Sequence, residues 1–351
     1  LHVSVLDGAD VVDIVRRTKD IRRSLPGNGW PYFTSRFLNV EGAKAFGSHF
    51  PMEILFNYLG RYQQLEREDG LLRLEPQVAE VAVPDVGQGV QCLALFEISV
   101  VVVQGAAHFR VVYNRNIQRQ PDVGRWMRSW EQSLQEAAER LSRIGVERTL
   151  SDFPLLSLTY AGLDKVKNEL LRAVGAASFD DVEDIYPCSP MQQGLLLSQM
   201  RKSGLYEVAF TFEVISSQPR APVEVEKFLF AWQKVVDRHA ILRTVFVDSV
   251  SKEGLFDQLV FRRVTTRTVQ KVCVGTDTEA LAALGEQEPM DYSKARPPHQ
   301  LTVCQTASGK MFCKLEISHA IIDVVSRQVL LRDLNLAYGG VLPSSLGMLY
   351  S

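Results

Sequence analysis

The sequence contains few cysteines, and none of them has a metal-binding or redox spacing. Five cysteines occur among 351 residues, at positions 92, 188, 273, 304 and 313, and no two form a C-x-x-C pair. An odd and scattered set argues against a disulfide framework and does not indicate a zinc site. We therefore expect no bound metal, and reduced thiols as in a cytoplasmic protein.

Long apolar runs and an excess of one charge are also missing. The longest mainly apolar run, residues 98–103, is far shorter than the roughly 20 residues that span a bilayer. The 39 basic and 41 acidic side chains nearly cancel to a net charge of -2, and no basic block occurs. These absences argue against a membrane surface or a nucleic acid as partner.

The beginning of the sequence lacks a methionine and shows no signal-peptide pattern. We infer from this that the chain begins inside a larger polypeptide. A hydrophobic content of 46% with 23% charged residues is that of an ordinary globular protein, and the length suits two lobes with real cores.

Strand-like and helix-like segments alternate along most of the chain. Residues 90–103 and 107–113 are apolar runs that predict a buried hairpin, and residues 123–144 carry Trp126 and Trp130 at helical spacing. No Gly-rich phosphate loop interrupts this alternation. The pattern predicts an α/β fold with mainly antiparallel or mixed sheets flanked by helices. We place the boundaries of a first lobe, a linker and a second lobe at residues 1–144, 145–184 and 185–351.

A basic helix is expected near the N-terminus, over residues 9–25. One face is apolar, and the other carries Arg16, Arg17, Lys19, Arg22 and Arg23. We interpret this charge run as a solvated helix face. The sequence Pro-Gly-Asn-Gly at 26–29 then predicts a turn.

The strongest candidate for chemistry lies at residues 317–326. Alternating apolar residues over 311–317 predict a strand, and the apolar spacing from Val325 onward suits a helix. His319 would lie at the strand-to-helix turn, where the backbone holds the imidazole while its ring stays open to a substrate. Asp323 has three alternatives: it caps the helix, orients the histidine, or locks the loop through an arginine.

Three segments of the second half resemble the condensation domains of nonribosomal peptide synthetases. They are Ile185-Tyr186-Pro187-Cys188-Ser189-Pro190-Met191-Gln192-Gln193-Gly194, Arg238-His239-Ala240-Ile241-Leu242-Arg243-Thr244-Val245-Phe246 and Ser318-His319-Ala320-Ile321-Ile322-Asp323-Val324. The last resembles the family motif His-His-x-x-x-Asp-Gly, whose second histidine carries the chemistry. The resemblance implies that His319 is catalytic and that each lobe has the chloramphenicol-acetyltransferase type of fold.

The candidate motif departs from the family pattern at two positions. Ser318 replaces the first histidine, which has a mainly supporting role, and Val324 replaces the glycine. A branched side chain at position 324 disfavours a positive backbone φ there. It would also hinder the close approach of a substrate, which the resemblance places in a tunnel leading to the histidine. We also predict that Asp323 is a buried acceptor that pairs with Arg243, because a buried carboxylate without a cation is costly.

Two segments of the first half resemble the end of an epimerization domain of the same superfamily. Residues 15–29 match a basic helix that ends in Pro-x-x-Gly, and residues 52–62 contain the sequence Phe-Asn-Tyr-Leu-Gly. Within it, Asn57 either faces a substrate tunnel or is a structural amide satisfied by backbone. The family's upstream catalytic motifs would precede residue 1, so we expect no epimerase activity from this chain alone.

The resemblance implies peptide-bond formation between two carrier-bound thioesters during secondary-metabolite biosynthesis. The implied partners are the carrier domains, whose phosphopantetheine arms hold the substrates, and the adenylation domains of the same synthetase; no cofactor binds the chain directly. An epimerization lobe in front implies, by analogy, a D-configured donor. Two alternatives stay open: a catalytically silent scaffold or interaction region, and a permuted stand-alone acyltransferase.

Overall fold

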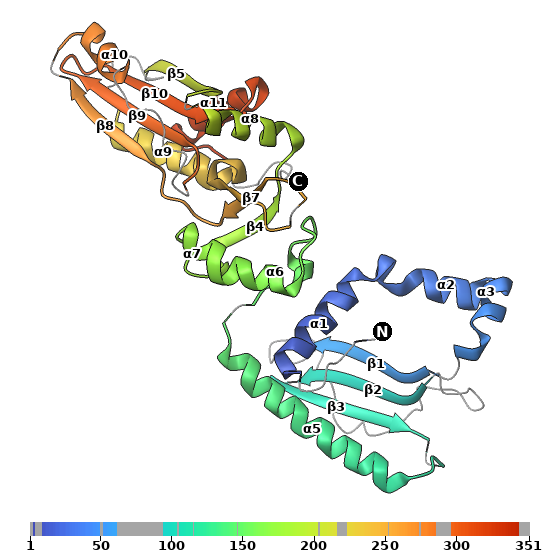
Figure 1. The fold of residues 1–351 in the computed structure, drawn as a ribbon. Helices are drawn as coiled ribbons and strands as arrows, with labels where there is room; N and C mark the ends of the chain where they lie inside the picture. Colours follow the sequence, from blue (N-terminus) through green and yellow to red (C-terminus); the bar gives the residue numbers. More distant parts are fainter. Residues whose placement is uncertain are drawn as a thin grey trace. The chain divides into compact units, whose positions relative to one another are not determined.

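Two units with separate sheets make up the chain (Figure 1). The computed structural model describes residues 3, 9–49, 52–61, 94–103, 105–114, 116–145, 147–202, 204–215, 223–251, 253–273, 275–285 and 296–343. The first unit comprises Leu1–Ile14 and Ile21–Arg143, and the second comprises Val15–Asp20 and Ile144–Ser351.

The first unit contains a mixed three-stranded sheet in the order β1-β2-β3. β1 runs parallel to β2, and β2 pairs antiparallel with β3, so the predicted hairpin pairing is confirmed; its residues 90–93 lie outside the described part. The predicted burial is wrong for β3, most of whose residues are exposed, whereas β2 is partly buried. The elements are α1 (Val11–Ser24), η1 (Pro26–Gly29), α2 (Trp30–Leu38), α3 (Val40–Ala45), η2 (Gly47–His49), β1 (Met52–Arg61), β2 (Ala94–Val103), β3 (Ala106–Tyr113) and α5 (Gln120–Arg143).

Aromatic side chains join α5 to this sheet. Trp126 and Trp130, one helical turn apart, stack with ring centroids 6.2 Å apart. Trp126 contacts Phe96 of β2 at 5.1 Å, and Trp130 meets Phe109 of β3 edge-on at 5.3 Å. The helical spacing of the two tryptophans therefore marks the face that α5 turns toward the sheet, as the sequence predicts.

The second unit contains two sheets, a mixed one in the order β5-β10-β9-β8 and an antiparallel one in the order β4-β7-β6. These sheets and their flanking helices confirm the predicted α/β class. The elements are η3 (Leu150–Asp152), α6 (Tyr160–Lys165), the π-helical turn η4 (Val166–Leu170), α7 (Leu171–Ala173), η5 (Phe179–Asp181), β4 (Val182–Pro187), α8 (Pro190–Arg201), β5 (Glu207–Val214), α9 (Val225–Arg238), η6 (Ala240–Arg243), β6 (Thr244–Asp248), β7 (Phe256–Phe261), β8 (Thr268–Cys273), α10 (Asp277–Gly285), β9 (His299–Thr306), β10 (Met311–Ser318) and α11 (Val324–Tyr338).

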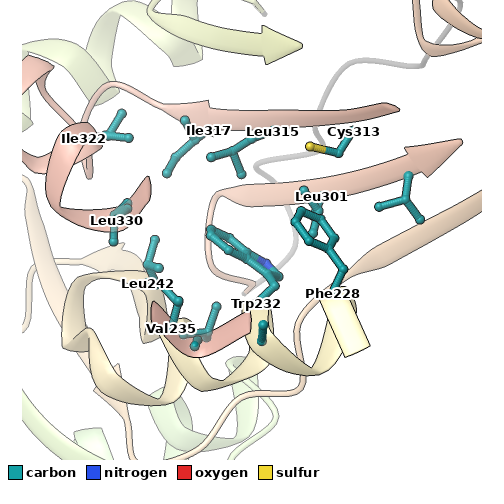
Figure 2. Close-up of a cluster of buried hydrophobic side chains, with 14 of the residues drawn as sticks. Phe228, Trp232, Val235, Leu242, Leu301, Cys313, Leu315, Ile317, Ile322 and Leu330 are labelled. Atoms are coloured by element: carbon teal, nitrogen blue, oxygen red, sulfur yellow. The ribbon is translucent and has the colours of Figure 1, made fainter. Parts of the chain in front are cut away.

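Strand β10 has different partners on its two faces, because side chains alternate along a strand. Cys313 and Leu315 lie in the core shared with α9 and α11, whereas Phe312 packs with Leu284 of α10. Figure 2 shows Trp232 of α9 directed into the first of these cores, where it is 1% exposed. Packing on both faces therefore fixes the strand that leads into the candidate site.

Residues 145–184, expected as a linker, contain a packed core instead. Phe153, Leu163, Val166 and Leu171 are each no more than 2% exposed, and they cluster with side chains of β4, β6 and β7 such as Leu259. The apolar spacing of α6, η4 and α7 gives this continuous helical stretch a buried face. The segment is therefore part of the second unit rather than a connection.

The basic helix α1 is not the solvated face that the charge run predicts. The ammonium of Lys19 lies 2.6 Å from the Asp152 carboxylate, and the guanidinium of Arg17 lies 5.1 Å from the centre of the Tyr160 ring. Only the last two arginines of the helix are exposed among its five basic residues. The run of basic residues therefore correctly predicted a polar helix face. It did not predict the side chains, such as those of Asp152 and Tyr160, that this face contacts.

Candidate active site

His319 lies in the turn between β10 and α11, where its N–H donates to the carbonyl of Tyr206 at 2.8 Å. The N–H of Ser318 donates to the Pro298 carbonyl at 2.9 Å, and the N–H of Ile321 donates to the Ser318 carbonyl at 3.1 Å. The His319 side chain is exposed. The backbone is thus fixed while the imidazole remains accessible, which is the arrangement required of a group that meets a substrate.

Ser318 is fully buried at 0% exposure, and its hydroxyl is well satisfied. The side-chain amide of Gln199, on α8, donates from Nε2 to Ser318 Oγ at 2.9 Å, and the Ala320 N–H donates to the same oxygen at 3.1 Å. A buried hydroxyl without partners would cost about 1–3 kcal/mol. These bonds explain how a serine is accommodated at this position. Sequence reasoning missed Gln199.

Tyr206 presents its carbonyl to His319 from an unusual backbone conformation. Its φ is 55°, and only two other non-glycine residues of the described part have a positive φ. Gln199 Nε2 lies 3.3 Å from the same Tyr206 carbonyl. One carbonyl therefore accepts hydrogen bonds from both the candidate histidine and α8.

Asp323 caps α11, and none of the arginines that the structure describes, Arg243 included, forms an ion pair with it, so the predicted pair with Arg243 is wrong. Its carboxylate accepts from the Ser326 N–H at 2.7 Å and from the Ser326 hydroxyl at 2.6 Å. These two bonds lower the pKa of Asp323, and the nearby His319 adds a smaller effect in the same direction. The side chain is exposed, so no buried counter-charge is needed. Of the three predicted alternatives, the structure shows the helix cap.

Arg243 is buried at 5% exposure and binds elsewhere in the second unit. Its guanidinium lies 2.6 Å from the Glu183 carboxylate of β4. The same nitrogen donates to the backbone carbonyls of Phe261 and Arg262, at the end of β7. Arg243 therefore ties η6 to the β4-β7-β6 sheet, because those elements, and not the turn at Asp323, supply its acceptors.

Val324 is the first residue of α11, and its backbone is helical. In the described part of the chain, the non-glycine residues with positive φ are Asn28, Arg119 and Tyr206. Valine is therefore not strained at this position, in contrast to the expectation of a turn that favours glycine. Val324 is 66% exposed and lies next to the histidine turn. Any effect of its side chain on substrate access to His319 is therefore steric.

Asn57 lies on β1, opposite Ser99 in the parallel ladder with β2. Its side chain is exposed, as are those of its neighbours Phe56 and Tyr58. In this unit, the Asn57 amide therefore needs no buried hydrogen-bond partner. A role for Asn57 in a substrate tunnel stays a prediction.

His239 belongs to a charged cluster around the buried carboxylate of Asp333 on α11. Asp333 Oδ2 lies 3.0 Å from His239 Nε2 and 3.0 Å from Arg238 Nε, and Arg332 lies 3.0 Å from Oδ1. Burial lowers the pKa of His239, although Asp333 opposes this shift. Burial raises the pKa of Asp333, but the bonds from Arg332 and His239 outweigh it and the pKa is lowered. A neutral histidine beside a charged aspartate fits a structural role.

A further buried histidine, His299, lies on β9 opposite Ile317 of β10. It is 4% exposed, and its Nε2 lies 2.8 Å from the Leu242 carbonyl. Burial lowers its pKa to about 4, and the bond to that carbonyl acts in the opposite direction. His299 is therefore neutral and serves packing, unlike the exposed His319.

No group of three or more His, Cys, Asp or Glu side chains in the described ranges is arranged to hold a metal ion. Burial raises the pKa of the Cys188 and Cys313 thiols to about 12, so these thiols are unreactive. Among the helices of the described residues, none is long and apolar enough to cross a membrane. The candidate site consists of His319 and the groups that hold its turn.

Comparison with known proteins shows the family to which the second half of the chain belongs. Residues 182–345 match the family model of the condensation domain, and this part of the chain belongs to the condensation-domain family. The chain is similar over nearly its whole length to fungal nonribosomal peptide synthetases. It is 44% identical over 348 residues to nonribosomal peptide synthetase 4 of Gibberella zeae, which covers 97% of this chain and 4% of that protein.

Two further relatives show the same relationship. The FR901469 synthetase of a Dothideomycetidae species is 42% identical over 354 residues, or 100% of this chain and 2% of that protein. Nonribosomal peptide synthetase 1 of Aspergillus fumigatus is 39% identical over 349 residues, or 97% of this chain and 6% of that protein. The chain thus spans only a few per cent of the length of these relatives.

Solved structures that resemble the chain do so over about half of it. The X-domain from teicoplanin biosynthesis is 18% identical with a TM-score of 0.39, and covers 47% of this chain and 35% of that one. The condensation domain from the Monacolin K polyketide synthase MokA is 16% identical with a TM-score of 0.38, and covers 47% and 36%.

Proposed function

We propose that this chain is a segment of a nonribosomal peptide synthetase that joins two carrier-bound thioesters through an amide bond. The observation that carries this proposal is the exposed imidazole of His319 on a turn whose backbone is held by Tyr206 and Pro298. Membership of residues 182–345 in the condensation-domain family supports the same reaction class. An upstream carrier domain would present the acyl or peptidyl donor, and a downstream carrier domain the aminoacyl acceptor.

In the proposed reaction, the α-amine of the acceptor attacks the thioester carbonyl of the donor. A carbon–nitrogen bond forms, the carbon–sulfur bond breaks, the amine gives up one proton, and the phosphopantetheine thiol of the donor carrier leaves. Presenting an amine of pKa about 7.7–8.0 in its neutral form at pH 7 costs only about 1 kcal/mol, whereas orientation can supply roughly 7–11 kcal/mol. His319 therefore acts as much by placing the amine as by accepting its proton.

The proposed partners are the carrier domains and the adenylation domains of the same synthetase. The curated relatives are nonribosomal peptide synthetases, and the chain spans a few per cent of each, which leaves room for such domains. In this proposal the chain binds no cofactor of its own, and the phosphopantetheine arms of the carriers bring both substrates.

The first unit is proposed to be the C-terminal lobe of an epimerization-type domain. Its support is the sequence Phe-Asn-Tyr-Leu-Gly on β1, with the Asn57 side chain exposed on the strand. An epimerization step before condensation would supply a D-configured donor. Chiral analysis of the donor residue in the product tests this point, and an L residue contradicts it.

The test of the proposed reaction is a condensation assay on the synthetase that carries this chain, with loaded donor and acceptor carriers and product detection by mass spectrometry. We expect His319→Ala to slow product formation by about 10²–10⁴-fold, the usual contribution of such a group. His108→Ala, which removes an exposed histidine from β3, is the matched control and should leave the rate unchanged. Product formation unaffected by His319→Ala would remove this residue from the mechanism.

A second candidate function, a catalytically silent scaffold, is favoured by the exposed Val324 side chain beside the histidine turn. In this alternative, the branched side chain would narrow the approach of a substrate to His319. Val324→Gly in the same assay separates the two functions. Activity that appears only in this variant would show that the natural domain is silent, whereas activity in the unmodified protein excludes the scaffold role.

A further inference from the structure

Two glutamines of α8 contact the residues on either side of His319. Gln199 bonds to the Ser318 hydroxyl, and Gln192 donates from Nε2 to the Ala320 carbonyl at 3.1 Å. Residues seven apart lie two turns apart on the same helix face, so one face of α8 reaches both flanks of the turn. Both glutamines are only 7% exposed.

Gln192 has two roles that involve different atoms. Its Oε1 accepts from the Ser189 N–H at 2.9 Å and so completes the capping box of α8. Its Nε2 donates to the Ala320 carbonyl and to Gln258 Oε1, the latter at 3.0 Å. The side-chain oxygen therefore caps the N-terminus of α8, whereas the side-chain nitrogen bonds to the turn at His319.

Gln199 reaches the two groups that fix the other side of the turn. Its Nε2 lies 2.9 Å from Ser318 Oγ and 3.3 Å from the Tyr206 carbonyl. That carbonyl also accepts the N–H of His319. Gln199 thus holds both the residue before the histidine and the acceptor of the histidine's own backbone bond.

We propose that Gln192 and Gln199 are positioning residues for His319, and that their hydrogen bonds from α8 hold the backbone of the turn in place. This inference rests on the proposed function. The glutamines act through the Ser318 hydroxyl and the Ala320 carbonyl, so they place the imidazole without contacting reacting atoms. Misplacing a catalytic group by about 1 Å can cost on the order of 10²-fold in rate, so the loss of either donor should be measurable.

Three variants separate positioning from helix stability. Gln192→Glu keeps an oxygen for the Ser189 N–H at the helix N-terminus, where a carboxylate is favourable, but removes the donor to Ala320. Gln199→Ala removes the contact with Ser318. Gln193→Ala is the matched control, because this neighbouring glutamine bonds to the Cys188 carbonyl at 3.3 Å and the Leu255 N–H at 2.8 Å, away from the turn.

Hydrogen–deuterium exchange of the full protein tests directly whether α8 holds the backbone of the turn. We expect Gln192→Glu and Gln199→Ala to speed amide exchange at residues 318–321 by at least tenfold, and Gln193→Ala to leave it unchanged. Ser318→Ala should also speed exchange there, and the double variant should show less than the sum of the two single effects, because both variants remove the Gln199–Ser318 bond. Unchanged exchange in both α8 variants would overturn the proposal whether or not the protein is active.

Kinetics in the condensation assay test the consequence. Gln192→Glu and Gln199→Ala should lower kcat by about ten- to a hundredfold. The KM for either loaded carrier should stay close to that of Gln193→Ala. The thermal midpoint of Gln192→Glu should fall, because its second carboxylate oxygen faces the Ala320 carbonyl and Gln258 Oε1, so the separate response of kcat and KM is the readout of positioning. Faster exchange with an unchanged kcat would overturn the positioning role. Product formation that does not depend on His319 would refute the proposed function alone, since the exchange experiment still decides whether α8 holds the turn.

Discussion

The N–H of His319 donates to the carbonyl of Tyr206, whose own backbone is left-handed with φ 55°. A left-handed conformation costs a residue with a side chain roughly 1–2 kcal/mol and persists only where its surroundings determine it. Here the surroundings include the Gln199 amide, which binds the same carbonyl. The backbone of the candidate histidine is therefore held by a residue in an unfavourable conformation.

Substitutions of Tyr206 should reveal this conformational cost. Asparagine tolerates the left-handed region, so Tyr206→Asn should leave the free energy of unfolding nearly unchanged, whereas the branched side chain of Tyr206→Val should lower it by about 1–2 kcal/mol. Urea unfolding followed by circular dichroism measures the difference. Leu205→Val is the control, because its backbone φ is not positive. Equal stability of the two Tyr206 variants would contradict the left-handed assignment.

The cap formed by Asp323 predicts a small and pH-dependent contribution to stability. Asp323→Ala should lower the free energy of unfolding by about 1 kcal/mol at pH 7, and Asp323→Asn, which keeps an acceptor, by much less. Because the Ser326 bonds lower the folded-state pKa, the contribution is present above the unfolded carboxyl pKa and is lost as the pH falls through the folded value. A loss of about 3–5 kcal/mol would instead indicate a buried ion pair.

Asp333 should matter far more than Asp323 because its carboxylate is buried. Asp333→Asn leaves Arg238 and His239 without their anionic partner, and we expect a loss of about 3 kcal/mol in unfolding free energy. Thermal unfolding of this variant beside Asp323→Asn provides the comparison. Similar midpoints for the two variants would contradict the structural importance of the cluster.

The buried His299 predicts a loss of stability in mild acid. Because its folded-state pKa is about 4 and its ordinary value is 6.5, only the unfolded state takes up the proton between these pH values, so stability falls as the pH decreases through this window. The difference amounts to roughly 3 kcal/mol. His239, whose pKa is also lowered, contributes in the same direction.

The measurement is urea unfolding between pH 7 and pH 4 for the unmodified protein and for His299→Gln. The variant removes the His299 ionisation, so its stability should depend less steeply on pH. His108→Gln, at an exposed histidine, is the control and should retain the full slope. If His299→Gln keeps that slope as well, another group carries the pH dependence.

Local patterns predicted the elements that position the candidate site. Alternation along β10 and the helical spacing after it placed His319 at the end of a strand, because these periods follow directly from backbone geometry. The cap was also visible, since Asp323 and Ser326 have the spacing of a capping box. The ion-pair prediction wrongly treated Asp323 as buried, although its sequence context contains a local polar partner.

Contacts between distant segments could not be predicted in the same way. A buried aspartate paired with an arginine does exist in this unit, but it joins Asp333 to Arg238 rather than Asp323 to Arg243. The sequence places Gln192 and Gln199 on a helix but does not show that this face of α8 contacts the turn at His319. Sequence periodicity indicates which residues are polar, whereas tertiary packing decides which of them are buried together.

The packed core of residues 145–184 determines where this chain can be joined to a segment from a related protein. Phe153 and Leu163 lie in the same core as Leu259, and the Asp20 carboxylate accepts the Ser151 N–H at 2.9 Å. A crossover near residue 184 would take the two halves of this core from different parents, and a side chain too large for its place in a core costs about 1–3 kcal/mol. Chimeras joined upstream of α1 inherit the core from one parent and should be recovered in soluble form more often.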